Sequence, residues 1–353
     1  MAAASQNRVL ALKNHLPKPS AGRIIAERIR KGQFDTMNMK SYGKSRIKLN
    51  DRAVKRALAI SAFVSLLIAG MASAQNLIIT ESKPSGNVYE YTPSGVLQST
   101  IVNINEPAYM AFNSAGDLFI GGFNNAWNIT EMTPSGGEST FGSLDEPNGL
   151  AFDSAGDLFE ADLGSGKIYE YTNHDGTLSS NATLFASGLN DPAGLAFDSA
   201  GDLFAANNQT GTIYEYTNHD GTLNPTSGVF ASGLQWPSGL AFNGSGDLFE
   251  ADAFTGKINE FTPGGKESTF ASGFSDPIGV AIDSAGNLFV ADINSGTVTK
   301  ITPSGAKSTF ASGLSSPAGV TFQPVPNLQE GITNGTIQTI VTMPSPYYST
   351  VLQ

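Results

Sequence analysis

Acidic side chains at repeated positions are the groups of this chain that could bind a cation or a polar ligand. Trp236 replaces an acid at one of these positions, and Tyr109 stands close to another. Carboxylates beside an aromatic ring suit Ca²⁺, a cationic ligand or a sugar stacked on the ring. Alternatively, the acids form a solvated rim and Trp236 packs its own loop. The acids, each directly before a recurring proline, are Glu106, Glu146, Asp191 and Asp276.

Oxygen ligands for a divalent cation form a second candidate set. Ca²⁺ takes carboxylate and amide oxygens, and such groups recur at the ends of short apolar runs. Alternatively, each acid caps the turn that follows it, as short polar side chains do. At these positions, the candidate ligands of Ca²⁺ or another divalent cation are Asp162, Asp252 and Asp292.

Two further acids stand where the chain is otherwise apolar. Glu160 and Glu250 correspond to Ile120, Ala205 and Val290 in neighbouring units. Burial raises a carboxyl pKa, and acids with a perturbed pKa often mark functional sites. The alternative is a carboxyl group hydrogen-bonded to Ser or Thr or to a buried water.

A repeat of 40 or 45 residues must position all of these groups. Each unit contains four short apolar segments, separated by turns rich in Gly, Asn, Asp and Pro. This spacing predicts an all-β, six-bladed β-propeller with four-stranded antiparallel blades. The 45-residue units carry a longer connection between the last two strands, where insertions are tolerated. The units begin at Pro107, Pro147, Pro192, Pro237, Pro277 and, in shortened form, Pro317.

The two ends of the repeat region complement each other. The segment 317–323 supplies only a first strand, and the segment 76–102 supplies only the other three. Together they predict a sixth blade that closes the ring and removes two free sheet edges. The alternative is an open array with both edges unpaired. In either case, the loop before each first strand and the turn after each second strand lie on one face.

The repeated phrase P-x-G-[LV]-A-[FI]-[DN]-S-A-G-[DN]-L-F-x-A-D, followed by G-x-[IV]-x-x-[FYI]-T-P-x-G, resembles NHL-repeat propellers over residues 76–323. It is also similar to the six-bladed group that contains the gluconolactonase and senescence-marker lactonases. Those lactonases hold a divalent metal on the axis through Glu, Asn and Asp. Asn148 matches that Asn, but Ala193 stands where the next unit would supply Asp, and 317–323 contains no Glu. The resemblance therefore implies the fold rather than one activity.

The amino-terminal part predicts export. Residues 44–74 combine basic residues, a short apolar run and Ala72-Ser73-Ala74, which is typical of a signal peptide cleaved after Ala74. The alternative is a membrane anchor, for which the run is short. We expect residues 1–43 to form an unstructured upstream extension, which a start codon assigned too early would explain. We expect a periplasmic, cell-surface or extracellular protein.

Composition restricts the partners of the mature chain. Residues 75–353 carry six basic and twenty-eight acidic side chains, a net charge of −22, which argues against nucleic acid. The chain has no cysteine, so disulfides and thiolate chemistry are excluded. We expect residues 75–323 to form the propeller and residues 324–353 a disordered tail without a membrane anchor. A monomer is expected.

These observations favour an exported propeller that acts as a binding or interaction module. Its acidic channel mouth would bind a protein, a glycan or a cation. One alternative is a metal-dependent hydrolase of the lactonase type that uses Asn148 and nearby acids. A second alternative is a structural surface repeat protein without a small ligand.

Overall fold

The structure is a computed structural model that describes residues 75–122, 128–142, 144–324, 328–333 and 336–341. All of these residues belong to the second of the chain's two units, 62–353. The expected extension 1–43 and signal peptide 44–74 lie outside the described residues. No helix among the described residues is long and apolar enough to span a membrane.

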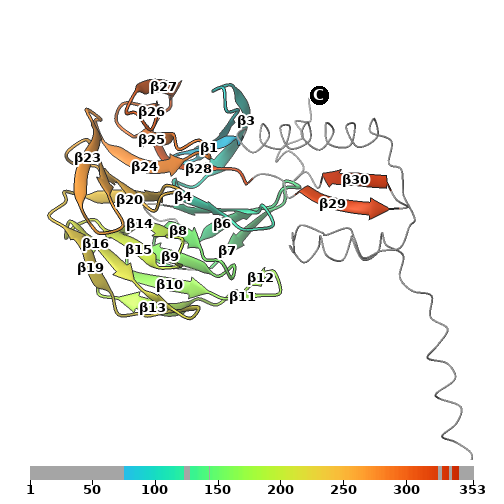
Figure 1. Ribbon diagram of the computed structural model, residues 1–353, viewed down its shortest axis with the longest axis horizontal. Coiled ribbons are helices and arrows are strands. Elements are labelled where there is room, and N and C mark those ends of the chain that lie inside the picture. Colours follow the sequence, from blue (N-terminus) through green and yellow to red (C-terminus); the bar gives the residue numbers. More distant parts are fainter. Residues whose placement is uncertain (1–74, 123–127, 143, 325–327, 334–335, 342–353) are drawn as a thin grey trace, which may run out of the picture. The chain divides into compact units, whose positions relative to one another are not determined.

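Six four-stranded antiparallel sheets form the blades of a propeller (Figure 1). We number them in chain order of their second strands. The inner strands of blades 1 to 6 are β28 (Pro317–Phe322), β4 (Pro107–Phe112), β8 (Pro147–Phe152), β14 (Pro192–Phe197), β20 (Pro237–Phe242) and β24 (Pro277–Ile282). The second strands are β1 (Leu77–Glu81), β5 (Leu118–Gly122), β9 (Leu158–Asp162), β15 (Leu203–Asn207), β21 (Leu248–Asp252) and β25 (Leu288–Asp292). The third strands are β2 (Gly86–Tyr91), β6 (Ile129–Met132), β10 (Lys167–Tyr171), β16 (Thr212–Tyr216), β22 (Lys257–Phe261) and β26 (Thr297–Ile301). The outer strands are β3 (Leu97–Ile104), β7 (Glu138–Phe141), β13 (Thr183–Ser187), β19 (Gly228–Ser232), β23 (Glu267–Ser272) and β27 (Lys307–Ser312).

Short hairpins account for the 45-residue units. Blade 3 carries β11 (Asn173–His174) and β12 (Thr177–Leu178) between its third and outer strands. Blade 4 carries β17 (Asn218–His219) and β18 (Thr222–Leu223) at the same place. A further hairpin of β29 (Leu328–Thr333) and β30 (Thr336–Val341) lies in the segment 324–353, for which the sequence predicts no regular structure.

The predicted closure by both ends of the repeat region is confirmed. β28 pairs antiparallel with β1, so that Leu77 lies opposite Phe322, and the two strands are neighbours in Figure 1. The Thr80 hydroxyl joins three strands, because it accepts from the Gly319 amide at 2.7 Å and donates to the Ala108 carbonyl of blade 2 at 2.7 Å. Each inner strand contacts those of the two adjacent blades, which closes the ring.

Glycines let the inner strands approach each other closely. A Cβ atom added to Gly194 of blade 4 would lie 2.3 Å from the Ser238 carbonyl oxygen of blade 5. A Cβ added to Gly149 of blade 3 would lie 1.8 Å from the Ala193 carbonyl oxygen of blade 4. A side chain at either position would therefore force neighbouring blades apart.

Phenylalanine triplets fill the space between blades. Phe204 of β15 packs edge-on against Phe230 of its own blade and Phe242 of the next, with ring centroids 5.0 Å apart in both pairs. Between blades 5 and 6, Ile282 replaces the third ring, and Phe249 keeps its contact with Phe270. A cleft of about 250 Å³ lies there, lined in part by these three side chains.

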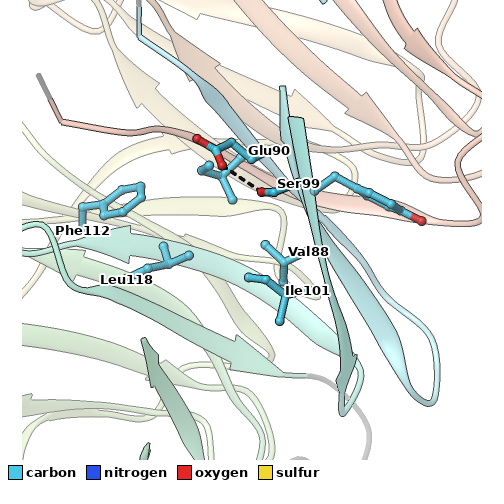
Figure 2. A pocket seen from close by; sticks show the side chains of 8 residues that line it. Val88, Glu90, Ser99, Ile101, Phe112 and Leu118 are labelled. Atoms are coloured by element: carbon cyan, nitrogen blue, oxygen red, sulfur yellow. Dashed lines mark hydrogen bonds between the residues drawn. The ribbon is translucent and has the colours of Figure 1, made fainter. Parts of the chain in front are cut away.

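The interface between blades 1 and 2 lacks the triplet. Ile78 stands in place of the second-strand phenylalanine, and a water-sized cavity of about 10 Å³ remains. Figure 2 shows Val88 and Ile101 of blade 1 facing Phe112 and Leu118 of blade 2 around it. The Ser99 hydroxyl donates to the Glu90 carboxylate at 2.8 Å at the edge of this cavity.

Candidate functional site

In the blades whose inner turns lie within the described residues, two loops meet on one face of the propeller, which we call the loop face. The entry loop precedes each inner strand, and the inner turn joins the second strand to the third. In blade 5, the Ala253 amide of the inner turn donates to the Trp236 carbonyl of the entry loop at 3.1 Å. Blade 4 repeats this bond between Asn208 and Asp191 at 3.1 Å, and blade 6 between Ile293 and Asp276 at 3.0 Å. In these three blades, the residue before the inner-strand proline therefore lies beside the inner turn.

Two side-chain positions of the loop face are compared between blades: the residue before the inner-strand proline, and the second residue of the inner turn. On blades 4 and 6 these two positions hold an acid and a carboxamide. The Gln209 side-chain amide donates to the Asp191 carboxylate of blade 4. The Asn294 side-chain amide donates to the Asp276 carboxylate of blade 6 at 3.1 Å. Both acids are partly exposed and both amides are exposed, so each pair offers polar groups to solvent.

Blade 5 places two aromatic rings at the same two positions. Trp236 is 55% exposed and Phe254 is 68% exposed, and their ring centroids lie 6.0 Å apart with an interplanar angle of 62°. Every other Phe, Tyr or Trp side chain that the structure describes is buried or half-buried. The sequence offered the alternative that Trp236 packs against its own loop. Its one aromatic contact among the described residues is this edge contact with Phe254, which leaves most of the indole open to solvent.

The backbone of Trp236 is strained. Its φ of 63° lies in the left-handed region, as do those of Glu106 (42°), Glu146 (65°) and Asp191 (53°). Asp and Asn tolerate this region better than a bulky residue, for which it costs about 1–2 kcal/mol. The loop geometry therefore does not explain the choice of tryptophan.

The acids at the ends of the second strands hold the loops. Asp162 accepts the amides of Asp145 and Ser165, both at 2.8 Å. Asp252 and Asp292 make the equivalent bonds in blades 5 and 6, at 2.8–3.3 Å, and Asp292 also accepts the Asp276 amide at 3.0 Å. All three are nearly fully buried, each in its own blade. No three His, Asp or Glu side chains of the described segments come together as a metal site.

Tyr109 and Asn148 lie near the axis rather than on the loop face. The Tyr109 hydroxyl of blade 2 donates to the Ile278 carbonyl of blade 6 at 3.4 Å, so the side chain reaches past blade 1. Burial raises the pKa of Tyr109, which the Ser238 hydroxyl opposes and the carboxylates of Glu250 and Asp276 reinforce. Asn148 is 1% exposed, and its Oδ1 atom has no partner among the described residues.

Glu106 and Glu146 occupy the entry loops of blades 2 and 3. Both are partly exposed, and one Glu106 oxygen is buried without a partner within the described segments. Residues 123–127 of blade 2 are outside the described residues, and the matching position of blade 3 is Gly164. The structure therefore places Asp191, Trp236 and Asp276 each beside a side chain of the inner turn, and shows no such neighbour for these two glutamates among the described residues.

The two buried glutamates are inaccessible to a ligand. Glu160 has no exposed surface, and neither of its carboxyl oxygens has a hydrogen-bond partner in the part of the chain described. Burial raises the pKa of Glu160 well above its usual range, and the Asp162 carboxylate adds to the shift. Burial also raises the pKa of Glu250, against the Asn259 amide that donates to it at 2.9 Å.

Sequence reasoning missed three members of the loop face. Phe254, Gln209 and Asn294 stand at one position of the inner turn, two residues after the last residue of the second strand. An alignment of the six units at this position gives Lys83, Asn124, Gly164, Gln209, Phe254 and Asn294. Their variation beside a constant strand is the signal that could have identified them.

Comparison with known proteins supports the fold. No family model matches the chain, and no curated protein matches it. A nidogen/laminin complex structure is 20% identical, covers 71% of this chain and 99% of its own, and superposes with a TM-score of 0.59. An inactive virginiamycin B lyase from Staphylococcus aureus with quinupristin is 16% identical, with coverages of 71% and 93% and a TM-score of 0.50. A provisionally assigned gluconolactonase is 16% identical, with coverages of 60% and 80% and a TM-score of 0.49. The predicted six-bladed propeller is confirmed, and at these identities the likeness establishes the fold alone.

Proposed function

We propose that this protein is an exported binding module whose loop face holds its ligand at the Trp236–Phe254 pair. One observation carries the proposal: blade 5 replaces the acid–carboxamide pair of its neighbours with two exposed rings. Exposed aromatic side chains that touch each other are typical of binding sites, since they bury a large area when a ligand covers them.

The repeat itself supplies the contrast that makes this substitution informative. Blade 4 builds the same loop with Asp191, at a φ of 53° and with the same two backbone bonds between entry loop and inner turn, and blade 6 repeats one of these bonds at Asp276. Tryptophan adds strain at a φ of 63° and gains only an edge contact with Phe254. A strained residue that adds little to folding is better explained by function.

The metal-dependent hydrolase has less support. Asn148 provides one buried oxygen, whereas Asp162, Asp252 and Asp292 accept backbone amides in three separate blades. The hypothesis of a structural repeat protein accounts for the closed propeller. It does not account for the exposed aromatic side chains of Trp236 and Phe254.

Crystals of the protein soaked with separate panels of saccharides, organic cations and short peptides would test the proposal. We expect bound density over Trp236 and Phe254 for members of one panel. Density confined to other surfaces, or a divalent cation bound at Asn148 with turnover of a lactone, would contradict it.

A further inference from the structure

We infer that the ligand is a neutral oligosaccharide, bound across the loops of blades 4, 5 and 6. This inference rests on the proposed function, because it names the chemical class of the ligand at the same face. A sugar ring presents a face of C–H groups that packs on an aromatic ring, and hydroxyl groups around its edge. The ligand therefore requires exposed rings with hydrogen-bonding groups beside them.

The rings of blade 5 supply two surfaces of different orientation. Trp236 and Phe254 are inclined by 62°, and both are more than half exposed. Two contiguous surfaces suit consecutive units of a chain better than a single small molecule. Each ring can exclude water from one sugar face.

The flanking blades supply both donors and acceptors. In each pair, Asp191–Gln209 and Asp276–Asn294, the recorded hydrogen bond uses one amide N–H and one carboxylate oxygen. In each pair, the other amide N–H, the amide carbonyl and the other carboxylate oxygen have no hydrogen-bond partner among the described residues. Hydroxyl groups both donate and accept, so they can satisfy all of these groups. A lysine ammonium group has donors only, so it would use the acceptors and leave the amide N–H groups unmatched.

Blades 4 and 5 are linked at the site by side-chain bonds. The Asn208 amide of blade 4 lies 3.5 Å from the Ser238 hydroxyl of blade 5, which donates to the Trp236 carbonyl at 3.4 Å. The polar groups of blade 4 and the aromatic pair are therefore neighbours, and a ligand can contact both.

Charge restricts the sugar further. Residues 75–353 carry a net charge of −22, and Asp191 and Asp276 belong to the two blades adjacent to the rings of blade 5. A uronic acid or a sulfated sugar would meet like charges at the site. The site therefore favours neutral sugars over acidic ones.

Titration calorimetry with the full exported chain tests the inference. The probes are neutral hexasaccharides of glucose, xylose, mannose and N-acetylglucosamine, a uronic hexasaccharide and a lysine-rich peptide. The double variant Trp236→Asp with Phe254→Gln reproduces the pair of blade 4, where Asp191 has a φ of 53°. It therefore keeps a loop that is known to fold. Leu184→Ala, at a 57% exposed position on an outer strand, is the matched control.

We expect at least one neutral hexasaccharide to bind, at least about tenfold more weakly to the double variant and equally to Leu184→Ala. The uronic hexasaccharide should bind more weakly than its neutral counterpart. The inference is overturned if no neutral hexasaccharide binds at millimolar concentration, or if the double variant binds as well as the wild type. Peptide binding that the double variant abolishes would overturn the sugar inference while leaving the proposed function in place. If no probe responds to the double variant, both fail.

Discussion

At the scale of single residues, Trp236 lowers the stability of the fold through its backbone conformation and presents an exposed indole. Its backbone occupies the left-handed region at a φ of 63°, and its indole is 55% exposed. Such a position is the kind at which a natural residue is poor for folding and good for function. Trp236 and its equivalents in the adjacent blades, Asp191 and Asp276, are recognisable from sequence, because each precedes a recurring proline.

Replacing Trp236 therefore has opposite expected effects on stability and binding. We expect Trp236→Asn to raise the free energy of unfolding by about 1 kcal/mol, since Asn tolerates a positive φ. Ligand binding should weaken in the same variant. Urea denaturation measures the first effect, and Asp191→Asn serves as a control because both residues accept this conformation. A destabilised Trp236→Asn would show that the indole contributes to folding.

Glu160 should make stability depend on pH. Its folded pKa is raised by burial, so the folded protein retains a proton that the unfolded chain releases above about pH 4.3. The stabilising contribution is complete below the unfolded pKa and declines as the pH rises through the folded pKa. Glu160→Val, which copies Val290 of blade 6, should be about 1–3 kcal/mol more stable than the wild type at pH 8.

Denaturation at pH 5 and pH 8 measures this effect. The advantage of Glu160→Val should grow with pH, whereas the exposed Glu267→Val control should show little change. An advantage independent of pH would mean that the folded carboxyl group is not protonated over this range.

At the scale of elements, glycines in the inner strands set the distance between blades. Gly194→Ala would place a methyl group 2.3 Å from the Ser238 carbonyl oxygen, so we expect a loss of at least about 2 kcal/mol. Gly228→Ala is the matched control, because nothing lies within 4 Å of its added Cβ and its φ is not positive. Thermal unfolding of both variants separates the clash from a general effect of alanine. Equal melting temperatures would contradict the packing described here.

The elements were largely predictable from sequence, and the departures have physical causes. Each unit repeats the apolar and turn residues of four strands, so the strands could be placed by comparison of units. Blade 1 departs because its outer strand, Leu97–Ile104, has no phenylalanine to pack beside Ile78, and its bulges differ from those of blade 6. The inner-turn position of Phe254 varies between units, so its contact with Trp236 required the structure.

At the scale of the whole molecule, β28 closes the ring without any disulfide. Truncation after Ser316 removes β28 and exposes one edge of β1, whereas truncation after Pro324 keeps the strand. We expect the shorter chain to lose cooperative unfolding or to associate through the open edge. Thermal unfolding with size-exclusion chromatography distinguishes these outcomes. A monomeric, cooperative shorter chain would show that closure is dispensable.

The stability of the whole molecule should not depend on divalent cations. Asp162, Asp252 and Asp292 already accept backbone amides, so Ca²⁺ has to displace these bonds to bind there. We expect the melting temperature to stay constant when Ca²⁺, Zn²⁺ or a chelator is added, because only an ion that binds the folded state preferentially would raise it. A rise with Ca²⁺ that Asn148→Ala abolishes would restore the metal hypothesis.

The central claim is that ligand covers the aromatic pair of blade 5, and the accessibility of Trp236 tests it most directly. The chain has two tryptophans, so Trp127→Phe leaves Trp236 as the only indole. Acrylamide quenching of its fluorescence should be strong in the free protein, because the side chain is 55% exposed. Neutral oligosaccharides at millimolar concentration should protect the indole from the quencher. Unchanged quenching with a saccharide bound, as measured by calorimetry in parallel, would place the binding site elsewhere.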